Sequence, residues 1–411
     1  MNARKKNKTS GFTIVELVIS MVVIGILATI MFISYGGIIK KVAVENLKSD
    51  LLSATSKLAK FKATYGVYPV TISCSVPDSK TNLCIKGTTS DTIFAYNVNT
   101  TASPDTFGLS ASKGNDVDLS YRTANGSEPI ACPAGYIVVP GSKTYGTSDF
   151  CVMKYEAKIK GNDNGATTYD SSFIPETRAS GTPWVYIDQI AARDESKTVC
   201  TGCHLISEAE WMTIAQNLLN VSSNWSGGTV GVGYIYSGHN DTDPENGIAA
   251  SNDDDGYFGT NDFAGDNGVP PESTLIGDTQ KRTLTLTNGE VIWDFSGNVN
   301  EWSDATIAGG KPGNTDDSGA SVYWRNFSSL TSKPVLPVNI YPEGTGIEGA
   351  SSWTSESMGI GKLGSNSNDT ELRGFRRGGD FDDSGIDGVL SLRIDSSPDG
   401  IGNNNGFRVA R

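Results

Sequence analysis

Histidine is scarce in this 411-residue chain, and cysteine is absent from its second half. His204 and His239 are the only histidines, which argues against histidine-centred catalysis and His-rich zinc sites. All six cysteines lie at or before Cys203. Charged residues make up only 19% of the chain, and 46 acidic against 33 basic residues give a formal net charge of −13. Because an acidic surface repels phosphate backbones, we expect no nucleic-acid partner.

The apolar residues are concentrated near the start of the chain. Residues 12–39 contain one charged side chain, Glu16. At ~1.5 Å per residue, a helix of this length crosses a hydrocarbon layer of ~30 Å. The preceding segment MNARKKNKTSG carries four basic residues and no acidic one, which favours a cytoplasmic start and an outward-facing remainder. Periodicity alone leaves a plain membrane anchor as an alternative.

The junction GFTIVE at residues 11–16 resembles the prepilin signature of type IV pilins and type II secretion pseudopilins. The resemblance implies a leader over residues 1–11, cleavage between Gly11 and Phe12, and methylation of the new amino group. It also implies that Glu16 pairs with the N-terminal amine of a neighbouring subunit, because a lone carboxylate in hydrocarbon needs a partner. The implied partners are a prepilin peptidase, other pilin subunits and the pilus or type II secretion assembly machinery. The implied location is the bacterial inner membrane before assembly and then the cell surface or an extracellular filament.

Beyond Lys41 the helix is predicted to continue to residue 64 with one apolar face. Six apolar residues follow at spacings of three or four: Val44, Leu47, Leu51, Ala54, Leu58 and Phe61. The sequence YGVYP at 65–69 ends this pattern and resembles the helix exit of pseudopilins. We expect residues 65–130 to form a small pilin-like β region.

From residue 131 to the C-terminus, the chain resembles the formylglycine-generating-enzyme-like branch of the C-type lectin fold. The motifs that carry the resemblance are HLISEAEW (204–211), GNVNEW (297–302), RGG (377–379) and GFRVAR (406–411). Asn300 departs from the family pattern, which often has tryptophan there. The resemblances together imply an α+β protein, in which a long pilin helix and a small β-domain precede a lectin-like domain of short strands and long loops.

The cysteine distribution argues against the chemistry of that enzyme family. The family's oxygenase binds copper(I) through two cysteines near the C-terminus. No cysteine occurs between Gly378 and Arg411. We therefore expect no copper and no enzymatic activity, and a membrane-anchored formylglycine-generating oxygenase is the disfavoured alternative.

The sequence CTGCH at 200–204 matches the c-type haem attachment pattern. His204, however, opens the stretch that matches a structural helix of the resembled family, so we expect no haem. An even number of cysteines in an oxidising compartment favours disulfides instead. Proximity in the sequence suggests three pairs: Cys74–Cys84, Cys132–Cys151 and Cys200–Cys203.

Acidic loops provide the oxygen donors that calcium requires, although such loops are more often solvated turns. The resemblance implies two structural calcium sites. One maps onto Asp255 and the Tyr257 carbonyl. The other maps onto Asp294, the carbonyls of Gly297 and Val299, and Glu301. We therefore expect calcium to hold loops that lack regular backbone pairing.

Residues 380–405 resemble the variable segment of proteins that diversity-generating retroelements target. In those systems, mutation of adenines turns Asn codons into codons that cannot encode Lys, Glu, Gln, Met or Trp. None of these five residue types occurs from Asp380 to Asn405, and the asparagines at 403–405 look like unmutated template. An ordinary acidic loop is the alternative.

This segment is expected to display a ligand-binding surface between fixed flanks, RGG and GFR. Val389, Leu390 and Leu392 are expected to pack below it as core. The side chains expected to face outward are Asp380, Phe381, Asp382, Asp383, Ile386, Asp387, Arg393, Asp395, Ser396, Asp399 and Ile401.

These observations predict a type IV pilin-like surface subunit that displays a non-catalytic, lectin-like domain. The domain would bind an unknown extracellular or cell-surface ligand, in adhesion or recognition. The alternative is a type II secretion pseudopilin or minor pilin whose lectin-like domain is structural or caps a filament tip.

Overall fold

Helices and sheets are mixed in the computed structural model, so the protein has the α+β class that the sequence predicts. The structure describes Met21 and residues 42–99, 106–113, 116–124, 129–240, 247–257, 281–308, 323–325, 359–365, 370–383 and 387–411. Among these residues, no helix has the length and apolar character needed to cross a membrane. The predicted leader lies outside the described residues. The predicted membrane segment 12–39 also lies outside them, apart from Met21.

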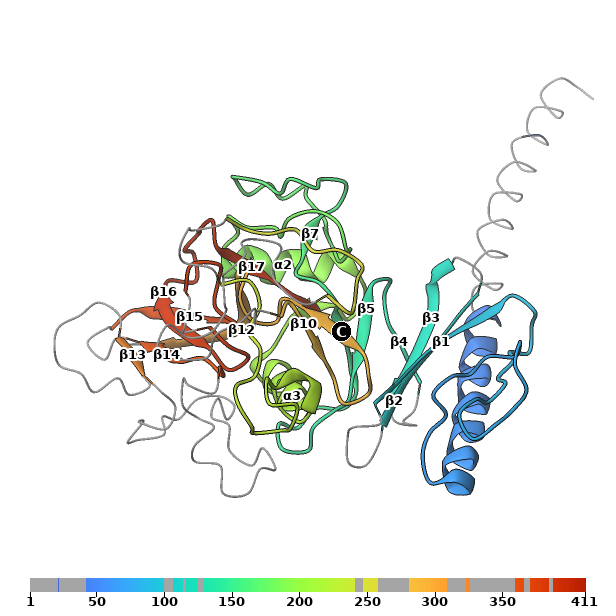
Figure 1. Ribbon diagram of the computed structural model, residues 1–411. Helices are drawn as coiled ribbons and strands as arrows, with labels where there is room; N and C mark the ends of the chain where they lie inside the picture. The colour runs from blue at the N-terminus through green and yellow to red at the C-terminus, as the bar shows by residue number, and fades with distance from the viewer. Residues whose placement is uncertain are drawn as a thin grey trace, which may run out of the picture.

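The helix at residues 42–65 packs along a four-stranded antiparallel sheet with the order β1-β2-β3-β4 (Figure 1). Its strands are β1 (Thr92–Asn99), β2 (Thr106–Lys113), β3 (Asp116–Ala124) and β4 (Ile130–Ala131). The apolar face of the helix is buried as its spacing predicts, with Leu47, Leu51 and Leu58 in one cluster with Leu109 of β2. The helix ends at Gly66, whose φ of 83° is a left-handed conformation that glycine adopts without strain.

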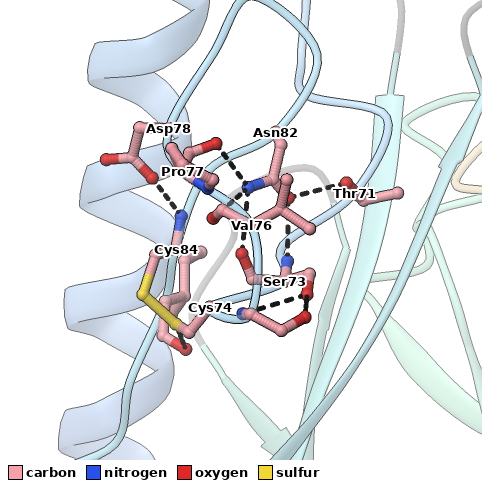
Figure 2. Close-up of a disulfide and its surroundings, with 10 residues drawn as sticks. Thr71, Ser73, Cys74, Val76, Pro77, Asp78, Asn82 and Cys84 are labelled. Atoms are coloured by element: carbon pink, nitrogen blue, oxygen red, sulfur yellow. Dashed lines mark hydrogen bonds between the residues drawn. A yellow bond between two sulfur atoms is a disulfide. The ribbon is translucent and has the colours of Figure 1, made fainter.

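The loop between this helix and β1 is held by a disulfide and by one asparagine side chain. Cys74 and Cys84 are bonded to each other (Figure 2). Asn82 is buried, and its amide donates to the carbonyls of Ser73, Val76 and Pro77 at 2.9–3.2 Å. The amide therefore satisfies carbonyl groups that no strand pairs, and it fixes the loop without regular secondary structure.

The C-terminal domain is built on two larger sheets, a six-stranded sheet with the order β13-β14-β16-β15-β12-β17 and a four-stranded sheet with the order β5-β6-β18-β9. The first contains β12 (Asn300–Ala308), β13 (Tyr323–Arg325), β14 (Leu363–Ser365), β15 (Leu372–Arg377), β16 (Leu392–Ser396) and β17 (Asn405–Phe407). The second contains β5 (Tyr136–Val139), β6 (Phe150–Met153), β9 (His204–Leu205) and β18 (Val409–Ala410). Two short pairs are β7 (Lys158–Ile159) with β8 (Pro175–Glu176), and β10 (Thr283–Thr285) with β11 (Val291–Trp293).

Two helices pack against these sheets, α2 (Gln189–Val199) and α3 (Glu208–Leu219). A short 3₁₀ turn, η1 (Ser222–Asn224), follows α3. The helix α3 starts with a capping box, in which Ser207 accepts from the Glu210 backbone N–H and the Glu210 carboxylate accepts from the Ser207 backbone N–H. The last strands of the chain join both sheets, because β17 pairs with β12 while β18 lies between β6 and β9. The last residues of the chain are therefore held by both sheets of the domain.

Candidate functional site

Two buried arginines fix the two flanks of residues 380–405, the C-terminal segment. Arg377, at the end of β15, donates to both carboxylate oxygens of Glu208 and to the Leu390 carbonyl at 3.0 Å. Arg408, after β17, donates to both oxygens of Glu301 and to the carbonyl of Trp293 at 2.9 Å. Both guanidinium groups are fully buried. Such charge-assisted, two-pronged pairs hold backbone positions firmly.

The predicted core below the segment is confirmed. Val389, Leu390 and Leu392 are each at most 1% exposed and belong to the larger apolar cluster of the domain. The indole N–H of Trp211 on α3 donates to the Val389 carbonyl at 2.9 Å. The helix α3 therefore supports the segment from beneath through both packing and a hydrogen bond.

The expectation of outward display is wrong for Asp380, Phe381 and Asp387, which are at most 4% exposed. Asp380 turns inward because its carboxylate accepts from the side-chain amides of Asn300 and Asn404, the latter at 2.6 Å. Asn300 is the residue at which the sequence departs from the pattern that it resembles, and here it supplies a polar partner for the segment. Burial, together with the nearby Asp383 carboxylate, raises the pKa of Asp380 to about 7.

The remaining described positions are at least partly exposed, although the side chains of Asp383 and Asp395 are only 13% and 10% exposed. They are Asp382, Asp383, Arg393, Asp395, Ser396, Asp399 and Ile401, whereas Ile386 lies outside the described residues. Part of this surface is a charge network, in which Arg393 donates to Asp383 at 3.2 Å and to Asp395 at 3.0 Å. Although burial raises the pKa of Asp395, the guanidinium groups of Arg376 and Arg393 outweigh it and hold that pKa below its usual value. The surface thus combines paired charges with one strongly exposed apolar side chain, Ile401.

A cavity of about 290 Å³ opens beside this surface. Its walls come from residues of three distant segments, 164–167, 182–186 and 247–248, and the C-terminal segment contributes Phe381 and Asn403. None of the described side chains that line it is charged. The backbone N–H of Tyr186 in one wall donates to the Gly402 carbonyl at 2.9 Å, which ties that wall to the C-terminal segment.

The CTGCH motif contains a disulfide in this structure. The three disulfides are Cys74–Cys84, Cys132–Cys151 and Cys200–Cys203, the pairs that the sequence suggests. His204 makes a hydrogen bond through Nε2 to the Glu210 carboxylate at 3.0 Å, and this bond raises the pKa of His204 to about 9. The motif thus joins the end of α2 to the start of α3 as a structural connection.

Most of the mapped calcium donors are engaged by protein groups in the described arrangement. Asp294 takes two bonds of 2.7 Å from the buried Arg282, and Glu301 takes those of Arg408. Asp255 is paired with Lys154 at 2.5 Å. In addition, the Tyr257 carbonyl accepts from the Thr283 hydroxyl at 2.6 Å. Within the described residues, no group of three or more His, Cys, Asp or Glu side chains could hold a metal ion. The mapped oxygens, apart from the Gly297 and Val299 carbonyls, thus have protein partners, and structural calcium stays a prediction from the resemblance.

The sequence did not reveal the outer walls of the cavity. No motif marks residues 164–167 or 247–248, which reach the C-terminal segment only through the fold. Tyr186 is one of three described non-glycine residues with a positive φ, at 57°, a feature with no signature in the sequence.

Comparison with known protein families gives a match at the N-terminus of the chain. Residues 6–32 match the prokaryotic N-terminal methylation motif. The N-terminus is therefore type IV pilin-like, as the sequence predicts. No curated protein matches the chain. A solved structure similar to the chain is PvdO from Pseudomonas aeruginosa, with 14% identity, coverage of 69% of this chain and 94% of that chain, and a TM-score of 0.27. A score this low supports no conclusion about the C-terminal domain.

Proposed function

We propose that this pilin-like chain is a surface subunit that is processed by a prepilin peptidase, assembles with pilin subunits, and binds an extracellular partner through its C-terminal domain without catalysis. The observation that carries the proposal is the construction of the C-terminal segment. Buried arginine pairs fix its flanks, and apolar residues support it from below, while side chains between them such as Asp382, Asp399 and Ile401 are exposed. The resemblance to variable proteins on a lectin-like fold supports the same interpretation.

The state of the cysteines favours binding over oxygenase chemistry. All six are joined in three disulfides, and none is free. Copper(I) sites of the resembled enzymes need thiolates, which disulfide sulfurs do not provide. The proposal therefore assigns the domain no copper and no haem.

Substituting Ile401 tests the proposed binding surface. Its side chain is 62% exposed, and loss of an exposed apolar anchor weakens a protein contact. Processed chain added in solution is expected to compete with cells that carry the protein for their target surface. The variant Ile401→Asp is expected to need about tenfold more chain for half-maximal competition, a change of ~1.4 kcal/mol.

The matched control is Val232→Asp, because Val232 is 52% exposed but lies outside the segment. It should compete like the unchanged chain. If the unchanged chain does not compete at all, the domain is a structural or tip-capping part of the filament. Equal competition by the two variants would place the contact elsewhere on the molecule.

Diversification of the segment predicts a pattern across a cell population. Deep sequencing is expected to show substitutions at adenines of codons 380–405, with codons 377–379 and 406–411 unchanged. Substitutions should persist at exposed positions such as Asp382, Asp399 and Ile401. They should be depleted at Asp380 and Asp387, whose burial leaves little room for other side chains. A uniform sequence, with no near-copy of the segment in the genome, would exclude diversification and leave a fixed adhesin.

A further inference from the structure

We propose that the disulfide Cys200–Cys203 is a thiol–disulfide exchange site, which accepts two electrons from an external dithiol. The pair belongs to the CTGCH motif at 200–204, which the proposed function does not use. The exchange is stoichiometric, so it is compatible with a chain that binds its partner without catalysis. The inference goes beyond the proposed function and does not depend on it.

The turn that carries the two cysteines has contacts that hold it without the disulfide. The backbone N–H of Cys203 donates to the Cys200 carbonyl at 3.1 Å, and Gly202 has a φ of 85°, as the third residue of a type II turn requires. Nε of Arg411 donates to the Thr201 carbonyl at 3.3 Å and binds the turn from outside. A disulfide that closes so short a loop also restricts the unfolded chain less than one that closes a long loop. Reduction should therefore leave the two thiols close together and the fold intact.

The two sulfurs differ in exposure and in their electrostatic surroundings. Cys200 is partly exposed and forms the C-cap of α2, where the negative end of the helix dipole disfavours a thiolate. Cys203 is 4% exposed, and the Tyr136 hydroxyl lies 4.0 Å from its Sγ. Although burial raises the pKa of Tyr136, the Arg411 guanidinium opposes that shift, so its positive charge acts at the same hydroxyl. A hydroxyl donor and a cation thus offset the burial of Cys203 and favour the thiolate there.

These differences assign the steps of the exchange. A thiolate of the dithiol attacks the more exposed sulfur, that of Cys200, and the new S–S bond forms as the Cys200–Cys203 bond breaks and Cys203 leaves as a thiolate. The second thiolate of the dithiol then attacks the dithiol's own sulfur in this mixed disulfide and releases Cys200. The dithiol ends as a cyclic disulfide, having lost two electrons and two protons, and both cysteines end as thiols. A monothiol completes the exchange poorly, because the turn keeps Cys203 close enough to attack the mixed disulfide and expel the monothiol.

The other two disulfides have different surroundings and serve as internal references. Both cysteines of Cys132–Cys151 are at most 3% exposed, so an external thiol reaches them poorly. Cys74 is exposed and Cys84 partly exposed, but the Asp78 carboxylate accepts from the Cys84 backbone N–H at 2.6 Å. An anion beside the disulfide disfavours a thiolate on its sulfurs. Exposure alone would make Cys74–Cys84 the fastest pair to react, so the relative rates distinguish exposure from electrostatics.

Timed reduction of the processed full chain, kept folded in detergent, tests the assignment. Dithiothreitol is added, samples are quenched with acid at intervals, and the free thiols are labelled with N-ethylmaleimide after unfolding. Peptide mass spectrometry then measures the label at each cysteine. We expect Cys200 and Cys203 to be reduced about tenfold faster than Cys74 and Cys84, because a stabilised leaving thiolate departs faster. Reduced glutathione at the same thiol concentration should leave the Cys200–Cys203 pair mostly oxidised. Reduction of Cys74 and Cys84 at an equal or higher rate overturns the proposal, as does equal reduction by glutathione.

Two single variants test the leaving group. Arg411→Met and Tyr136→Phe each remove a group that favours the thiolate on Cys203, so each should slow reduction of the CTGCH disulfide about threefold. The disulfide of the N-terminal β region should keep its rate in both variants. Tyr145→Phe is the matched control, because Tyr145 is 6% exposed and belongs to the other apolar cluster of the domain, and it should change neither rate. Unchanged rates in both test variants overturn the assignment of Cys203 as the leaving group.

Serine variants separate exchange from a purely structural cross-link. We expect Cys203→Ser, treated with glutathione disulfide, to form a mixed disulfide at Cys200, and Cys200→Ser to form none at the buried Cys203. The double variant with both serines should keep the urea midpoint of the unchanged chain, whereas Cys132→Ser with Cys151→Ser should lower it. A mixed disulfide at Cys203 alone, or an equal loss of midpoint in both double variants, overturns the proposal. Competition for the target surface would still stand in each of these cases, because it tests a different part of the domain.

Discussion

Replacing Arg408 by methionine is expected to lower the free energy of unfolding of the C-terminal domain by about 3–5 kcal/mol. The substitution leaves the carboxylate of Glu301, which is 1% exposed, without its cationic partner. It also removes the donors of the Met153 and Trp293 carbonyls, each bonded at 2.9 Å. Urea unfolding monitored by tryptophan fluorescence measures the change, because Trp293 lies beside the lost guanidinium.

Arg411→Met is the matched control. It changes the same residue type three positions later, where the side chain is exposed, and should cost less than ~1 kcal/mol. A double variant that also carries Glu301→Leu should recover much of the loss, because replacing both partners of a buried pair removes the unpaired charge. If Arg408→Met were as stable as Arg411→Met, the pair would not fix the C-terminal flank, and the proposed construction of the segment would fail.

The pH dependence of the Arg408→Met variant follows from Glu301. Burial already raises the pKa of this carboxyl, although Arg408 opposes the shift, so losing the guanidinium raises the pKa further. A folded-state pKa above the unfolded value means that stability is greatest at acidic pH and is lost as the pH rises through the folded-state pKa. The loss in the free energy of unfolding that Arg408→Met causes should therefore be smallest at acidic pH and largest near neutral pH.

Local features of the fold could be predicted because a few neighbouring residues determine them. The apolar face of the helix follows from a spacing of three and four residues, and its end follows from Gly66. The core residues Val389, Leu390 and Leu392 lie between flanks that the motifs identify. In each case the physical cause is contained in a short stretch of sequence.

The orientation of side chains in the segment could be predicted only in part. Asp380 and Phe381 lie among acidic and polar residues, so the sequence suggests exposure. Asp380 is buried because Asn300, 80 positions earlier, and Asn404 supply its hydrogen bonds. Likewise, the cavity combines segments far apart in the chain. Such contacts depend on how the strands are ordered in the sheets, which no local pattern states.

Replacing Gly11 by valine is expected to change the protein from fully processed to unprocessed. The match to the N-terminal methylation motif spans this junction, and a branched side chain would stand at the residue before the cut. The variant should keep the eleven-residue leader with its four positive charges and should lack a methylated Phe12. Intact-mass spectrometry of membrane fractions measures both changes. Gly25→Val is the matched control, because it places the same substitution inside the apolar stretch and away from the junction, and its chain should still begin at Phe12.

The charge at Glu16 then separates a pilin-like subunit from a plain membrane anchor. For an anchor, Glu16→Gln removes a charge from hydrocarbon, where a carboxylate costs ~2.5–3.5 kcal/mol, so membrane retention should be unchanged or improved. For a subunit that pairs this carboxylate with a neighbour's amine, the same substitution should leave cleavage intact but abolish recovery in sheared filaments. Filaments that incorporate Glu16→Gln as well as the unchanged chain would rule out the pairing. Since the C-terminal domain can meet a partner only where the N-terminus places it, this result also decides whether the proposed binding surface is carried on a filament.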